Sequence, residues 1–131
     1  MGFEIAKVGN EPIIVETMHT DFSLKNDLPV SIDQLQVMLD EVDEPHTFII
    51  DATEARLTFG DAIAGMASVT RGNTAVFKHP NLRQLLVVTT SNLVELTTRA
   101  FGQEQYGGVK SEAFGSLDEA IDYARAQAPA S

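Results

Sequence analysis

Residues 47–53 read TFIIDAT. Within this stretch, a continuous apolar run from Thr47 ends at the carboxylate of Asp51. Such a run is typical of a parallel strand whose two faces are both buried. A second strand pattern, LRQLLVV, extends from Leu82 to Val88 and is continuously apolar from Leu85 onward. The two runs predict neighbouring strands at the centre of a largely parallel sheet.

Helix signals follow each of these two strands. Residues 58–61, TFGD, predict a helix start after the first strand, and Gly72 predicts the end of that helix. After the second strand, Ser91 predicts the cap of a helix that Gly102 closes. A short last strand over residues 109–114 then leads to the capping box SLDE at Ser116, which predicts a C-terminal helix.

The N-terminal part of the chain predicts a hairpin and one more helix. Residues 3–8, FEIAKV, and 13–15, IIV, flank the turn dipeptide Gly9-Asn10, as expected for two paired strands. The polar stretch from His19 to Val30 predicts a loop. The capping box SIDQ at Ser31 predicts the helix start, and Pro45 ends that helix.

The predicted order is β-β-α-β-α-β-α-β-α over a single domain of residues 1–131. Strands that alternate with helices require crossover connections and hence parallel pairing, so we expect only the first strand to run antiparallel. The sequence therefore predicts an α/β fold with a mixed, mostly parallel sheet and an N-terminal hairpin strand.

Composition excludes several classes of function. A formal net charge of −10 makes the surface acidic, which disfavours nucleic acid and anionic lipid as partners and leaves a basic partner protein open. The chain has no cysteine, so it has no disulfide and no thiolate chemistry. No apolar run approaches the ~20 residues that a membrane span needs. The N-terminus shows no signal-peptide pattern, and we expect a cytoplasmic protein.

The element order and two motifs resemble the STAS or SpoIIAA-like domain family. The motifs are FIIDAT at residues 48–53 followed by TFGDAI at 58–63, and LLVV at 85–88 followed by FGSLDEA at 114–120. The second pair is similar to the SpoIIAA-like branch, which includes relatives of lipid-binding domains. The resemblance covers nearly the whole chain and implies a regulatory module that acts through protein contacts.

In the phospho-regulated branch of that family, a serine near the start of the second helix accepts phosphate. The matching positions here are Gly60 and Asp61, and neither accepts phosphate in that way. Asp61 either places a fixed negative charge at the helix N-terminus or completes a capping box with Thr58. The resemblance therefore does not extend to the phosphorylation switch.

The ends of the two central strands carry the candidate ligand or partner-binding residues. Open α/β sheets bind ligands outside the carboxyl ends of their strands. The candidates, together with those of the following helix start, are Asp51, Thr53, Thr58, Asp61, Thr89, Thr90 and Ser91. The structural alternative is that Asp51 bonds loop amides and Ser91 caps a helix.

Catalytic and metal signatures are missing from the sequence. A receiver-type phosphoacceptor could use Asp51 with Lys110, but Gly9-Asn10-Glu11 offers one carboxylate where that site needs several. The three histidines are far apart, and neither His-Glu-x-x-His nor Gly-x-Ser-x-Gly occurs. We therefore expect no catalytic residue, no metal and no cofactor.

These observations favour a non-catalytic regulatory or interaction module, expected as a homodimer. The alternative is a carrier or sensor of a small apolar or lipid-like ligand. It rests on apolar side chains in predicted loops, which either pack on the core or form a patch: Phe22, Leu24, Leu28, Phe59 and Phe77. A hydrolase that combines Asp51 with a histidine is a third hypothesis.

Overall fold

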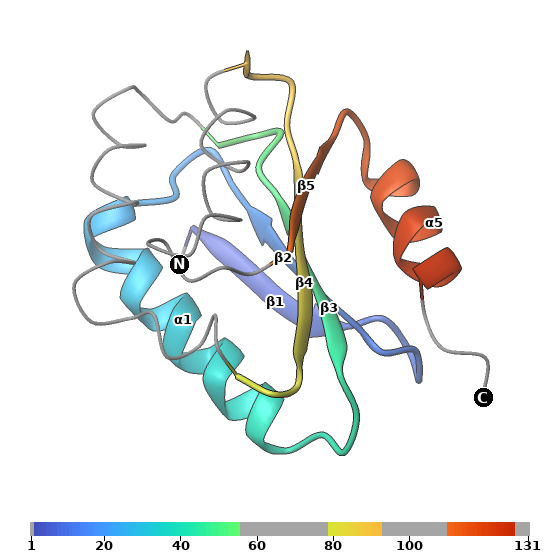
Figure 1. Ribbon diagram of the computed structural model, residues 1–131. Coiled ribbons are helices and arrows are strands. Elements are labelled where there is room, and N and C mark those ends of the chain that lie inside the picture. The colour runs from blue at the N-terminus through green and yellow to red at the C-terminus, as the bar shows by residue number, and fades with distance from the viewer. Residues whose placement is uncertain (1, 56–78, 93–109, 128–131) are drawn as a thin grey trace.

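The computed structural model describes residues 2–55, 79–92 and 110–127 and shows a five-stranded sheet between two helices (Figure 1). The strands are β1 (Phe3–Lys7), β2 (Ile13–Met18), β3 (His46–Asp51), β4 (Leu82–Val88) and β5 (Ser111–Phe114). The helices are α1 (Leu24–Asp40) and α5 (Leu117–Gln127). The predicted α/β class is confirmed. The helix predicted over residues 58–72 lies outside the described residues, as does the helix predicted after Ser91 beyond its first residue, Asn92.

The sheet has the predicted mixed pairing. Its order is β1-β2-β3-β4-β5, and β1 pairs antiparallel with β2 while the remaining neighbours pair in parallel. The hairpin turn places Gly9 at φ +52°, a conformation that residues with a Cβ rarely adopt. The prediction that only the first strand runs antiparallel is confirmed for the strands that the structure describes.

The two faces of the sheet bury different apolar clusters, because side chains alternate along each strand. The face under α1 contains Ile14, Phe48, Leu85 and Val87 from the sheet and Ile32, Leu35 and Leu39 from the helix. The opposite face contains Ile13, Ile49, Leu86 and Val88, covered by Ala120 and Ala124 of α5. Figure 1 shows the helices on opposite sides of the sheet. Burial on both faces explains the apolar runs within β3 and β4, at residues 48–50 and 85–88.

Helix α1 starts earlier than the sequence predicts. Ser23 is the N-cap, and its hydroxyl oxygen accepts a hydrogen bond from the Asn26 amide at 3.2 Å. The Asp27 carboxylate in turn accepts from the Ser23 amide at 2.8 Å. The predicted loop from His19 to Val30 is therefore wrong over its second half, and Ser31 lies inside the helix. Packing of the helix on the sheet outweighs the unfavourable Pro29 in its interior.

The link from β2 to α1 is packed against the first strand. The His19 amide donates to the Gly2 carbonyl oxygen at 2.8 Å, and the rings of Phe3 and Phe22 meet edge to face with centroids 6.3 Å apart. A Cβ atom on Gly2 would lie 2.5 Å from the Phe22 Cα atom, so only glycine fits there without a shift. This packing fixes the position at which α1 begins.

Helix α5 begins as the sequence predicts. Ser116 accepts a hydrogen bond from the Glu119 amide at 3.3 Å, which confirms its role as the cap. Tyr123 packs on Phe114 of β5, with ring centroids 5.1 Å apart, and Arg125 forms a bidentate ion pair with Glu11. These contacts fix α5 against the last strand and the N-terminal hairpin.

Candidate functional site

The carboxyl ends of the parallel strands bring most of the predicted site residues to one edge of the sheet. Asp51 ends β3 beside Val88 of β4, and the Ala52 amide donates to the Val88 carbonyl oxygen at 2.9 Å. Thr89 follows β4, and its amide bonds the Phe114 carbonyl oxygen of β5 at 2.9 Å. The predicted residues Thr58 and Asp61 lie outside the described residues.

We use the term carboxyl edge for the residues that follow these strand ends together with the start of β1. They are Glu4, His19, Asp51, Thr53, Glu54, Thr89, Thr90 and Ser91. The start of β1 belongs here because β1 runs antiparallel to β2, so Phe3 lies opposite Met18. The sequence predicts the Asp, Thr and Ser members of this set but not Glu4, His19 or Glu54.

The polar side chains closest to the strand ends hold turns. The Asp51 carboxylate accepts hydrogen bonds from the Thr53 amide at 3.1 Å and from the Thr53 hydroxyl at 2.7 Å. The Thr89 hydroxyl oxygen accepts from the Ser91 amide at 3.0 Å. Both patterns are local side-chain turns of the kind that Asp and Thr form with a backbone amide two residues on. These contacts give Asp51 and Thr89 a structural role at this edge.

A histidine between two glutamates extends the carboxyl edge. His19 Nδ1 lies 3.6 Å from a Glu54 oxygen, and Nε2 lies 3.8 Å from a Glu4 oxygen. The side chains of Glu4 and Glu54 are 80% and 61% exposed, so both carboxylates face solvent. No local sequence pattern shows this cluster, because it joins residues from β1, the link after β2 and the loop after β3. The cluster therefore places two exposed carboxylates at this edge of the sheet.

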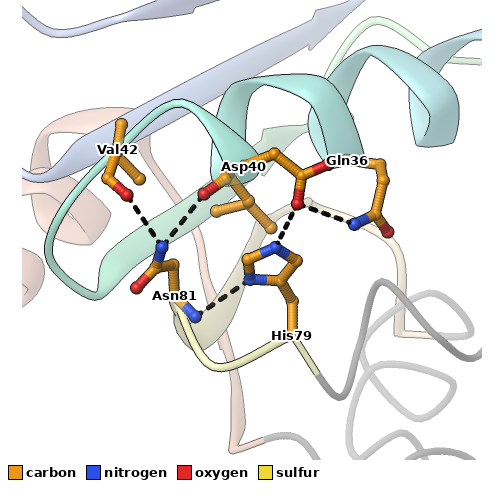
Figure 2. A network of polar contacts seen from close by, with 6 residues as sticks. Gln36, Asp40, Val42, His79 and Asn81 are labelled. Carbon is orange, nitrogen blue, oxygen red and sulfur yellow. Dashed lines mark hydrogen bonds and ion pairs between the residues drawn. The ribbon is translucent and has the colours of Figure 1, made fainter.

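The amino ends of β3 and β4 carry a second polar network, which anchors the end of α1 (Figure 2). The Asn81 side-chain amide donates to the carbonyl oxygens of Leu39 and Val42 at 3.0 and 2.9 Å. His79 Nδ1 accepts from the Asn81 amide at 3.0 Å, so Nε2 carries the proton and donates to Asp40 at 2.7 Å. This network satisfies helix-terminal carbonyl groups that lack intrahelical partners.

The histidine contacts give the hydrolase hypothesis no support. His19 contacts Glu4 and Glu54, and His79 contacts Asp40. His46 starts β3, at the opposite end of that strand from Asp51, and its Nδ1 atom donates to the Glu44 carbonyl oxygen at 2.8 Å. The hydrogen bond from His79 holds the pKa of Asp40 below its usual range. The His79–Asp40 pair holds the end of α1. The other ring nitrogen of His79, Nδ1, accepts a hydrogen bond from the Asn81 backbone amide and is not free for catalysis.

A buried carboxyl group that the sequence does not predict lies under α1. Glu16 of β2 is 2% exposed, on the same face as Ile14 and Met18. Burial raises the pKa of the Glu16 carboxyl group to about 7; the Ser31 hydroxyl partly opposes this shift and the charge of Asp27 reinforces it. The available signal was the alternation in IIVETM, which places Glu16 in line with two core side chains.

Comparison with known proteins identifies the fold. No family model matches the chain, and no curated protein matches it significantly. A solved structure of an uncharacterized DUF3478-family protein from Shewanella loihica PV-4, described as SpoIIAA-like, superposes with a TM-score of 0.56 at 15% identity. The match covers 93% of this chain and 91% of that chain. The chain has a SpoIIAA-like fold.

This likeness confirms the fold that the motifs and the element order predict, and at 15% identity it concerns the fold alone. In the described part of the SpoIIAA-like domain, no three His, Asp or Glu side chains are arranged to hold a metal ion. No helix among the described residues is long and apolar enough to cross a bilayer.

Proposed function

We propose that the protein is a non-catalytic regulatory module that binds the basic surface of a partner protein through its carboxyl edge. One observation carries the proposal. Asp51 and Thr89, which occupy the usual place for reacting groups in such sheets, are hydrogen-bonded within their own turns. The carboxylates of Glu4 and Glu54 project into solvent beside them.

The charge of the protein supports a basic partner. A net charge of −10 raises the local concentration of cationic surfaces and speeds their association. Charges at an exposed edge are screened by salt, so we expect the affinity for the partner to fall as ionic strength rises. The proposal includes a homodimer, since two-fold dimers are the commonest assembly of small soluble domains. It also includes a cytoplasmic location.

The carrier alternative has less support from the described residues. Of the loop side chains that suggested an apolar patch, Phe22 and Leu28 pack against the core cluster under α1. Residues 59 and 77 and the side chain of Leu24 lie outside the description. Apolar side chains that pack on the core do not line a ligand site, so protein binding is the better account of the described surface.

The test compares two double variants with equal charge changes. Glu4→Gln with Glu54→Gln neutralises the carboxyl edge. Glu41→Gln with Glu44→Gln neutralises two exposed carboxylates at the other end of the strands. Each form is purified gently from its own host and analysed by native and then denaturing mass spectrometry, which also counts the copies of the chain.

A bound protein that is retained by the wild type and by the Glu41 and Glu44 variant, and is lost from the Glu4 and Glu54 variant, supports the proposal. Retention of that protein by the Glu4 and Glu54 variant contradicts the proposed site. Recovery of a small releasable molecule in place of a protein contradicts the proposed function and favours the carrier. Turnover that is abolished by Asp51→Ala with folding intact contradicts the non-catalytic role.

A further inference from the structure

Glu16 occupies an apolar position between the sheet and the first half of α1. Its neighbours in register are Ile5 of β1 and Ile50 of β3, and both pack against the core cluster on this face. Among the described residues, Glu16 Oε2 is one of three buried side-chain atoms without a hydrogen-bond partner. A buried ionised carboxylate with an unsatisfied oxygen is strongly unfavourable, so this position favours the protonated form.

The groups that face Glu16 come from the helix and from the two neighbouring strands. The strands contribute the apolar Ile5 and Ile50. The helix contributes Ser31 and, one turn earlier, Asp27, whose negative charge acts on Glu16. Asp27 is the titratable group that faces Glu16 among the residues that the structure describes, and its charge repels an ionised Glu16.

The hydrogen bonds of Ser31 depend on the protonation state of Glu16. The Ser31 hydroxyl donates to the Leu28 carbonyl oxygen at 3.0 Å, so its one hydrogen is already used. A protonated Glu16 can donate to the Ser31 oxygen and so continue a chain from β2 to the helix backbone. An ionised Glu16 has no hydrogen to donate and must compete with Leu28 for the hydroxyl hydrogen. The Ser31 hydroxyl partly stabilises the ionised carboxylate, but desolvation by burial is the larger effect, so the docked helix on balance favours the protonated carboxyl group.

The helical segment above Glu16 is attached more weakly than the rest of α1. In residues 25–30, Lys25, Asn26 and Pro29 are exposed and the others are half-buried, whereas buried side chains start at Ser31. Pro29 removes the hydrogen bond that this position would otherwise donate to the Lys25 carbonyl oxygen. Segments with few buried apolar contacts open at low free-energy cost.

We propose that Glu16 is a proton-operated latch for the segment from Leu24 to Val30. With Glu16 protonated, the segment stays helical and docked on the sheet. When the segment opens, water reaches the carboxyl group, the proton leaves to solvent, and repulsion from Asp27 opposes closing. The segment therefore closes in mild acid and opens more often as the pH rises through neutrality.

The test measures amide hydrogen exchange of the full-length protein at about pH 5.5 and about pH 8.5, corrected for intrinsic exchange rates. The measured quantity is the protection of residues 24–30 relative to residues 32–39. Glu16→Gln keeps the size of the side chain and cannot ionise. Glu112→Gln changes an exposed glutamate of β5 in the same way and is the matched control.

In the wild type and the Glu112→Gln variant, the relative protection of residues 24–30 is expected to fall at least ~10-fold between the two conditions. In Glu16→Gln it is expected to stay constant. An equal fall in Glu16→Gln, or no fall in the wild type, overturns the latch. A parallel loss over residues 24–39 also overturns it, because the helix would then respond as one unit.

Discussion

The two halves of α1 lie on the same face of one sheet but are held there by different physical means. The second half buries Ile32, Leu35 and Leu39, and its end is fixed by Asn81 and His79. The first half packs the half-buried Leu28 on the same cluster and otherwise rests on a cap at Ser23 and on a buried carboxyl group. The stabilisation from apolar packing is independent of pH, whereas the stabilisation from a buried carboxyl group changes with pH. We therefore call residues 31–40 the permanent half of α1 and residues 24–30 the conditional half.

The two halves also differ in the sign of their response to pH. His79 lowers the pKa of Asp40, so this contact stabilises the fold above the usual Asp range and is lost as the pH falls through the lowered pKa. Burial raises the pKa of Glu16 from 4.5 to about 7. The Glu16 contribution is therefore complete below about pH 4.5 and is lost as the pH rises through about 7. Acid weakens one half of the helix, and mild alkali weakens the other.

The most damaging change should be one in the permanent half. Leu35 is 1% exposed, and we expect Leu35→Ala to lower the free energy of unfolding by about 2–5 kcal/mol at every pH. Urea denaturation measures this loss. Val37→Ala is the control, since Val37 is 54% exposed and its truncation should change stability by less than ~0.5 kcal/mol. Equal effects of the two variants would show that this half is not held by packing.

The next largest effect should come from the conditional half, and only above neutral pH. Because wild-type Glu16 must be ionised there, Glu16→Gln should raise the free energy of unfolding at about pH 8.5, by up to ~3 kcal/mol. At about pH 4.5 the two proteins should be nearly equal. Urea denaturation across the pH range checks both statements. A constant difference between the proteins at all pH values would contradict the assignment of this dependence to Glu16.

The Asn81 contacts predict a smaller, pH-independent loss at the other end of the helix. Asn81→Ala removes two hydrogen bonds to the carbonyl oxygens of Leu39 and Val42, which should cost about 1–2 kcal/mol. Asn81→Asp cannot donate these bonds and should cost at least as much. Hydrogen exchange should show the loss of protection in the last turn of α1. A loss of protection confined to residues 24–30 would contradict the assignment of the Asn81 contacts to the second half of α1.

The smallest effect should come from the cap. Ser23→Ala removes the hydrogen bond to the Asn26 amide and should cost about 1 kcal/mol, felt in residues 24–30. Ser116→Ala removes the corresponding cap of α5 and is the matched variant. Its loss of protection should appear in α5 and leave α1 unchanged. Hydrogen exchange distinguishes the two, and equal loss in both helices would mean that the helices open together.

The parts of the fold that the sequence predicts well are those with strong local patterns. The runs at β3 and β4 are apolar enough to indicate strands buried on both faces, and Ser116 stands in a capping box that the structure retains. The start of α1 was missed because Asn26, Asp27 and Pro29 match the composition of a loop. Their helical state depends on tertiary packing, which a local pattern does not contain.

The candidate site was predictable to the same limited extent. Asp51 and Thr89 were placed correctly because strand ends in a parallel sheet share one edge. The contact between His79 and Asp40 joins residues 39 positions apart, and the cluster around His19 joins three elements. The predicted strand ends at Val15, whereas β2 continues to Met18 and buries Glu16. Long-range contacts of single side chains depend on the assembled fold.

The most direct measurement of the central claim is the titration of the Glu16 carboxyl carbon by nuclear magnetic resonance in the folded, unmodified protein. We predict a midpoint of about 7, with amide signals of residues 24–30 shifting or broadening over the same pH range. A midpoint near the ordinary value of 4.5 would contradict it, because the carboxyl group would then ionise without cost and could not hold the helix conditionally.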